Sequence, residues 1–132
     1  MKKITVKTHQ RNQMIEVTDL LREMAAEYPD QDGRITAFVP HTTAGITINE
    51  NADPDVVHDM LLTLDELIPH HRRGYRHGEG NSDSHVKTTL TGNSSTVFFE
   101  KGQLLLGTWQ GVYFCEYDGP RTRQLWIKIE PD

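Results

Sequence analysis

Hydrophobic and polar positions alternate near the start of the chain and then change to a helical spacing. Ile4 and Val6 are separated by polar residues, which is typical of a half-buried strand. From Thr18 to about Tyr28, apolar residues recur every three or four positions, which predicts an amphipathic helix. The polar stretch that follows, "YPDQDG", is predicted to be a loop.

A second, stronger helix signal begins at Asp53. The Asp53 carboxylate can accept a backbone N–H as the N-cap, and Pro54 suits the first helical position. Pro69 ends the pattern. The predicted helix has a broad apolar face made of Val56, Val57, Met60, Leu61, Leu64, Leu67 and Ile68. A further short helix, capped by Ser82 or Asp83, is predicted where "SDSHVKTTLTG" begins.

The other apolar runs are rich in β-branched and aromatic residues, which favours strands. They are "RITAFVP" (34–40), "GITINE" (45–50), "STVFFE" (95–100), "QLLLGTW" (103–109), "GVYFCEY" (111–117) and "RQLWIKIE" (123–130). "DGP" (118–120) predicts a reverse turn between the last two. The order of elements predicts one α+β domain over residues 1–132, with a largely antiparallel β-sheet and two main helices.

Composition narrows the class of protein. With 132 residues, 36% of them hydrophobic and 25% charged, the chain is polar for a monomer, so we expect part of its burial to come from self-association. A net charge of −5 argues against binding to nucleic acid or to anionic membranes. One cysteine excludes an intrachain disulfide, and no apolar run is long enough to span a bilayer. We therefore expect a cytoplasmic protein.

The stretch "GYRHGEGNSDSH" (74–85) contains no aliphatic side chain, and His77 and His85 flank its glycine-rich part. A third histidine, His41, follows the strand that ends in "AFVP". A divalent metal held by imidazoles needs three or four converging ligands, and glycines at 78 and 80 would let His77 and Glu79 turn inward together. The alternative is a solvated loop with ordinary surface histidines.

Two other positions combine a structural and a chemical interpretation. Glu50, at a strand end close in sequence to His41, is either a general base, a partner that fixes a histidine tautomer, or an exposed carboxylate. Cys115 lies within an aromatic strand run, which indicates a buried structural thiol.

Arg121 and Arg123 share strand parity with Leu125 near the end of the chain. If that face points inward, the two guanidiniums can bind a phosphate or carboxylate in bidentate fashion. The alternative is that they form salt bridges with Glu116 or Asp118 across the hairpin.

Three segments together resemble the YjbQ family, whose members have been described as secondary thiamine-phosphate synthases. They are "HTTAGITINENADPDV" (41–56), "HGEGNSDSHVKTTLTG" (77–92) and "GTWQGVYFCEYDGPRTR" (107–123). The resemblance covers nearly the whole chain and implies a YjbQ-like α+β fold that assembles as a homotrimer. The reaction it implies joins hydroxymethylpyrimidine pyrophosphate to thiazole phosphate and releases pyrophosphate.

The resemblance also implies a site. It places a divalent metal ion, zinc or magnesium, on His41, His77 and His85, and it places acidic site residues at Glu50, Asp53 and Glu79. With Arg121 or Arg123 on a phosphate, this set would stabilise a leaving pyrophosphate. Two alternatives stay open: a metal-dependent hydrolase of a small phosphorylated compound, and a non-catalytic trimer that binds a metal or ligand.

Overall fold

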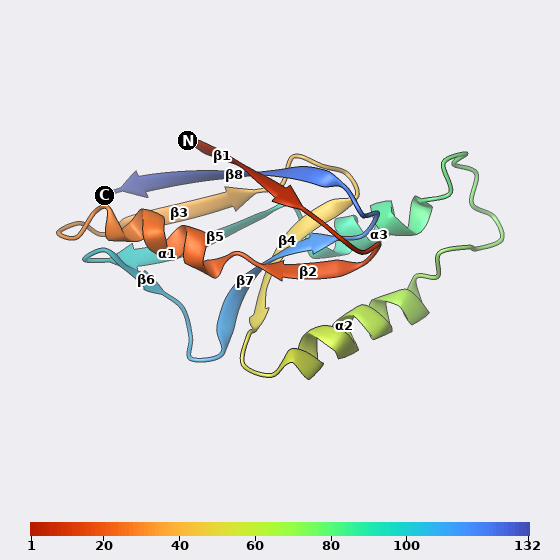
Figure 1. The fold of residues 1–132 in the computed structure, drawn as a ribbon, viewed down its shortest axis with the longest axis horizontal. Helices are drawn as coiled ribbons and strands as arrows, with labels where there is room; N and C mark the ends of the chain where they lie inside the picture. Colours follow the sequence, from red (N-terminus) through yellow and green to blue (C-terminus); the bar gives the residue numbers. More distant parts are fainter.

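Eight strands and three helices make up the computed structural model, which describes all of residues 1–132 (Figure 1). In chain order they are β1 (Lys2–Lys7), β2 (Gln13–Glu16), α1 (Thr18–Ala26), β3 (Gly33–Phe38), β4 (Ala44–Glu50), α2 (Pro54–Leu67), α3 (Ser82–Thr91), β5 (Ser94–Glu100), β6 (Gln103–Leu105), β7 (Gln110–Glu116) and β8 (Thr122–Pro131). The predicted α+β class is confirmed.

The strands form two sheets, and every strand pairing is antiparallel, as predicted. One sheet has the order β1-β8-β3-β5-β6 and the other β2-β7-β4. The strands are thus divided between two sheets instead of forming one. The short helix predicted after the two main helices is α3, which has ten residues.

The main core lies between the two sheets and is closed on one side by α1. Its buried side chains come from both sheets, for example Ile35 and Ile127 from the larger sheet and Ile46 and Phe114 from the smaller. Leu21, on α1, is also fully buried in this core. The alternation read from the sequence therefore gives the correct inward face of these strands.

Strand β7 is buried on both of its faces. Its side chains at Val112 and Phe114 enter the main core, while Tyr113 and Cys115 face a second, smaller cluster. Helix α2 packs against that cluster through Val57, Leu61 and Leu64. Burial raises the pKa of the Cys115 thiol to about 12, which agrees with the predicted structural thiol.

Helix α2 begins as the sequence indicates. The Asp53 side chain accepts a hydrogen bond from the backbone N of Asp55 at 2.9 Å, and Pro54 occupies the first turn. Yet none of the residues from Pro54 to Leu67 is buried, and Leu67 itself is 70% exposed. The broad apolar face of α2 is only partly covered by its own chain. No helix of the protein is long and apolar enough to cross a membrane.

Helix α3 starts one or two residues earlier than predicted, because its N-cap is Asn81 and not Ser82 or Asp83. At its other end the backbone comes very close to β4. A Cβ atom built on Gly45 would lie 2.5 Å from the carbonyl oxygen of Gly92, so only glycine allows this approach. The contact holds the C-terminal end of α3 against β4.

The predicted strand over 103–109 is shorter in the structure. Strand β6 ends at Leu105, because the chain turns at Gly107, whose backbone N donates to the Gln110 side chain at 2.9 Å. Trp109 lies in this turn and is 61% exposed, so it is not a core residue.

Candidate functional site

Two of the predicted metal ligands, His77 and His85, lie next to each other at the start of α3. Their ring centroids are 5.5 Å apart, and the rings meet edge to face. His85 belongs to the first turns of α3, while His77 lies in the α2–α3 loop (residues 68–81), which projects away from both sheets in Figure 1. The polar stretch singled out in the sequence therefore brings His77 and His85 together, as predicted.

The orientation of the His77 ring is fixed by a chain of hydrogen bonds. Asn81 is buried, and its side-chain nitrogen donates to the Asp118 carboxylate at 2.7 Å. The Asn81 oxygen therefore faces His77, whose Nδ1 lies 3.0 Å away. Since an amide oxygen can only accept, Nδ1 of His77 carries the proton. The second ring nitrogen, Nε2, is left with a free lone pair, which is the form in which histidine binds a metal or accepts a proton.

A metal ion fits this arrangement only in part. Outer hydrogen bonds of the kind that Asn81 and Asp118 make are typical of metal-binding histidines. However, no group of three or more His, Cys, Asp or Glu side chains in the chain is arranged to hold a metal. His77 and His85 therefore fit as two ligands of an incomplete set, and the three predicted histidines do not converge within one chain.

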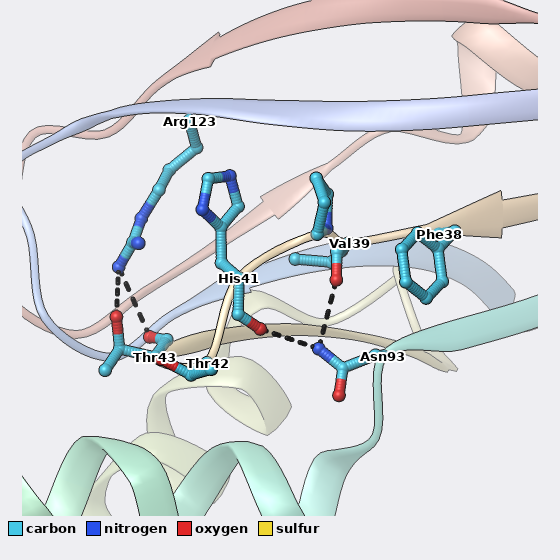
Figure 2. Close-up of a pocket in the computed structure, with 8 residues that line it drawn as sticks. Phe38, Val39, His41, Thr42, Thr43, Asn93 and Arg123 are labelled. Carbon is cyan, nitrogen blue, oxygen red and sulfur yellow. Dashed lines mark hydrogen bonds between the residues drawn. The ribbon is translucent and has the colours of Figure 1, made fainter.

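The third predicted ligand, His41, lies elsewhere, in a cavity of about 490 Å³ that Figure 2 shows. Its Nε2 accepts a hydrogen bond from the backbone N of Gln124 at 2.9 Å, so this nitrogen is already occupied. Burial, together with the positive charge of Arg123, lowers the pKa of His41 below its usual value. The neutral ring is thus held as an acceptor for β8, and it is not placed beside His77 or His85.

Asn93 closes the same cavity from the start of β5. Its side-chain nitrogen donates to the carbonyl oxygens of Val39 at 3.1 Å and His41 at 2.8 Å (Figure 2). These bonds hold the turn between β3 and β4, where regular strand pairing stops. The role of Asn93 here is to order the backbone.

The two arginines predicted to bind phosphate form the salt bridges given as the alternative. Arg123 is buried, its Nε donates to Glu116 at 2.8 Å, and one Nη donates to the hydroxyl of Thr43 at 2.8 Å. Arg121 is exposed and pairs with Asp118 at 2.9 Å. The strand parity predicted that both side chains point inward, and this is correct for Arg123 but not for Arg121.

Glu116 shows why Arg123 is buried. Burial alone would raise the pKa of this carboxyl, but hydrogen bonds from Arg123, Thr8 and the backbone N of Asp118 lower it below its ordinary value of 4.5. Glu116 is completely buried and therefore needs an opposite charge. This pair joins β7 to β8 and is a structural feature.

The three acidic site residues fall into two places. Glu79 is exposed in the α2–α3 loop, two residues from His77. Glu50 and Asp53 lie at the opposite end of α2, where Asp53 caps the helix. A helix of 14 residues is ~20 Å long. Within one chain, therefore, only Glu79 accompanies the His77–His85 pair.

Sequence reasoning missed the buried charges that position α3. The Asp83 carboxylate is fully buried and receives two hydrogen bonds from Arg11, at 2.9 and 3.0 Å. Lys87, one turn further along, is also buried and donates to Asp65 on α2 at 3.0 Å and to Asn12 at 3.2 Å. These contacts fasten the start of α3 to the β1–β2 connection and to α2.

Only part of this could have been found in the sequence. Asn81 was recognisable as a good N-cap residue between two histidines, but "NSD" offers three candidates for that cap. The pairing of Asp83 with Arg11 spans 72 positions and leaves no local pattern.

Comparison with known proteins agrees with the architecture. Residues 2–132 match the family model described as "UPF0047 protein YjbQ-like". The chain belongs to the YjbQ-like UPF0047 family. The UPF0047 protein YugU of Bacillus subtilis is 49% identical over 129 residues, covering 98% of each chain. The UPF0047 protein MJ1081 of Methanocaldococcus jannaschii is 47% identical over 130 residues, covering 98% of this chain and 94% of that one.

A crystal structure of a YjbQ/UPF0047 family protein from Clostridium acetobutylicum has the same fold. It superposes with a TM-score of 0.94 at 48% identity and covers 98% of this chain and 100% of that chain. The YjbQ resemblance drawn from three segments is therefore confirmed over the whole chain, and so is the YjbQ-like fold.

Proposed function

We propose that this YjbQ-like protein is an enzyme that acts on a small phosphorylated compound at a metal ion held in part by His77 and His85. The reaction we favour is that of a secondary thiamine-phosphate synthase, in which thiazole phosphate displaces pyrophosphate from hydroxymethylpyrimidine pyrophosphate. One observation carries the proposal: the Asp118–Asn81–His77 hydrogen bonds leave His77 Nε2 free beside the His85 ring. An exposed histidine without a function would not need a buried amide to fix its tautomer.

The metal, when bound, would supply positive charge to the phosphate groups of the leaving pyrophosphate. Imidazole ligands favour zinc over magnesium, so zinc is the ion we propose. The protein's own contribution is orientation: Asn81 and Asp118 hold the His77 ring, and α3 holds His85. Glu79 is exposed in the same loop, two residues from His77 in the sequence, and is the carboxylate we propose to accept a proton or to orient the second substrate.

We further propose that the protein is a homotrimer and that the site is completed between copies. Apolar side chains on α2 and α3 support this, since Leu67 is 70% and Leu90 is 67% exposed. Leu90 and Val86 lie on the same helix as His85, so a copy that covered them would reach the histidine pair. The neighbouring copy would then supply side chains that lie far from the His77–His85 pair within one chain. These are the imidazole of His41 and the carboxylates of Glu50 and Asp53.

The mass of the protein in solution tests the assembly. Light scattering coupled to gel filtration should give three times the chain mass of 15.1 kDa. A Leu90→Glu variant should shift the protein toward the single-chain mass, because it places a charge in the proposed contact. A wild-type protein that has the single-chain mass at all concentrations would rule out the trimer.

The compartment we propose is the cytoplasm, where the one free cysteine stays reduced.

Metal analysis tests the site. His77→Ala and His85→Ala should each weaken metal binding by about tenfold or more while the protein stays folded, because each substitution removes a direct ligand. His58→Ala is the matched control: His58 is exposed on α2, next to Asp59, and should keep its metal. Full metal content in both the His77 and the His85 variant would show that the ligand assignment is wrong.

Product analysis then separates the reactions. Pyrophosphate release that needs both substrates supports the synthase. Release from the pyrimidine substrate alone supports a metal-dependent hydrolase. If metal binds but a broad panel of phosphorylated compounds gives no turnover, the protein is a metal- or ligand-binding trimer and the enzymatic proposal fails.

A further inference from the structure

The arginines of the α2–α3 loop differ from all other arginines of the chain. Five of the eight arginines pair with a carboxylate of their own chain: Arg11, Arg22, Arg34, Arg121 and Arg123. The remaining three, Arg72, Arg73 and Arg76, are all in this loop, and none has a carboxylate partner. Residues 69–78 hold these three arginines and three histidines but no acid. A protein of net charge −5 thus gathers unpaired positive charge at one place.

Two of these arginines line a cavity. It has a volume of about 360 Å³ and is lined by His70, His71, Arg72, Arg73, Tyr75, His77, Gly80 and Ser82. This size is at the lower end of what a small-molecule site needs. Almost every lining side chain is polar, and both guanidiniums keep their hydrogen-bond donors. Such a lining favours an ionised ligand with several acceptor oxygens.

The backbone around the cavity is held in place by its own hydrogen bonds. His70 Nε2 lies 2.8 Å from the carbonyl oxygen of Gly80, so it donates across the base of the loop. The His70 and His71 rings are stacked with centroids 4.0 Å apart. A backbone hydrogen bond from Tyr75 to Arg72, 3.2 Å long, closes a turn at the arginine pair. A pre-formed loop loses less entropy when it binds a ligand.

We propose that Arg72 and Arg73 bind the phosphate groups of the substrate in this cavity, and that the substrate class is a diphosphate ester. The cavity shares His77 with the proposed metal site, so a phosphate held there would lie next to the ion. Arg121 and Arg123, which the sequence favoured for this role, are committed to Asp118 and Glu116. The inference rests on the proposed function for its orientation, with the reacting end toward His77, but not for the binding itself.

Titration of the purified full chain with inorganic pyrophosphate tests the inference. Arg72→Gln/Arg73→Gln should weaken pyrophosphate binding by about tenfold or more, because two charged donors are lost. Arg76→Gln is the control: it removes one positive charge from the same loop but from outside the cavity lining, and should change the affinity by less than about threefold. Each of the single variants Arg72→Gln and Arg73→Gln, which also removes one charge, should weaken binding more than Arg76→Gln does. All three positions are exposed, so the variants should unfold at the temperature of the wild type.

Several results would overturn the inference. Equal weakening by Arg76→Gln and by the double variant would mean a diffuse charge effect. Loss of binding in Arg121→Gln and not in the double variant, or no pyrophosphate binding by the wild-type protein, would also overturn it. Tighter binding of a single-stranded oligonucleotide than of pyrophosphate would point to a nucleic acid and not to a small diphosphate.

The two proposals fail in different ways. Suppose that the protein holds no metal and turns over no substrate, but the wild type binds pyrophosphate and the Arg72→Gln/Arg73→Gln variant does not. The proposed function then fails and the anion site stands. If metal content and turnover are present but the double variant binds pyrophosphate as well as the wild type, the anion site fails alone.

Discussion

Replacing Arg123 with methionine is expected to lower the free energy of unfolding by about 3–5 kcal/mol at neutral pH. Methionine keeps much of the length of the side chain but removes the charge and the donors. Glu116, which is completely buried, is then left without its ion pair and keeps only the hydrogen bonds from Thr8 and the Asp118 backbone. Urea denaturation at fixed protein concentration measures the loss, since association also contributes to stability.

An exposed ion pair provides the control. Arg34 contacts Glu130 at 2.7 Å, but the two side chains are 60% and 37% exposed. Arg34→Met should therefore cost less than about 1 kcal/mol. Equal losses in the two variants would show that burial does not set the strength of the Arg123–Glu116 pair.

The pH dependence of the difference has a defined sign. Because the pKa of Glu116 is lower in the folded protein than its ordinary value of 4.5, the unfolded chain takes up a proton more readily. The ion pair therefore contributes fully above that value, and its contribution is lost as the pH falls through the folded pKa. The gap in stability between wild type and Arg123→Met should be largest near neutral pH and should shrink in acid. A gap that grows in acid would contradict this.

Asp83→Asn is expected to cost about 3 kcal/mol, at the lower end of the range for a broken buried pair. Burial alone would raise the pKa of Asp83, but the hydrogen bonds from Arg11 and the charges of Arg11 and Lys87 lower it, so the carboxylate is ionised in the folded state. The neutral amide leaves Lys87, which is 1% exposed, with only Asp65 as a charged partner. The retained Asp65 contact is the reason for the smaller figure.

This variant also tests how α3 is positioned. Since Asp83 lies in the first turn of α3, between Asn81 and His85, its loss should reduce bound metal as well as stability. Asp19→Asn is the control: Asp19 pairs with Arg22 on the surface and its loss should cost less than about 1 kcal/mol. Denaturation and metal analysis of the same samples give both readouts. An Asp83 variant as stable as the Asp19 variant would refute the structural role.

Local signals account for the parts of the fold that the sequence predicted well. Asp53 and Pro54 specify the start of α2 by chemistry confined to one turn, and the structure has the cap they indicate. The alternation along β3 and β8 likewise needs no knowledge of the partner strand. The end of β6 was harder to place, because the Gly107–Gln110 turn stops a run of apolar residues that would otherwise continue.

The candidate site depends on long-range contacts, and there sequence reasoning was less successful. Each of His41, His77 and His85 is a reasonable ligand by type, but spacing does not show that His41 lies in a separate cavity and accepts from Gln124. Strand parity placed Arg123 inward but could not choose between an anion and Glu116 as its partner. The sequence also does not show that Arg72 and Arg73 lack a carboxylate partner, because the pairs formed by Arg11, Arg22, Arg34, Arg121 and Arg123 are set by the fold.

The sparsely covered helix α2 has a consequence for how the protein forms. An isolated helix of 14 residues is marginal in water, and α2 contributes no buried side chain of its own to the chain's cores. In the proposed trimer, ordering of α2 and of the loop that follows it would then be coupled to association. Dilution of such a trimer would loosen the α2–α3 loop before it unfolded the two sheets, so the proposed activity per chain would fall with protein concentration while the sheets stayed intact.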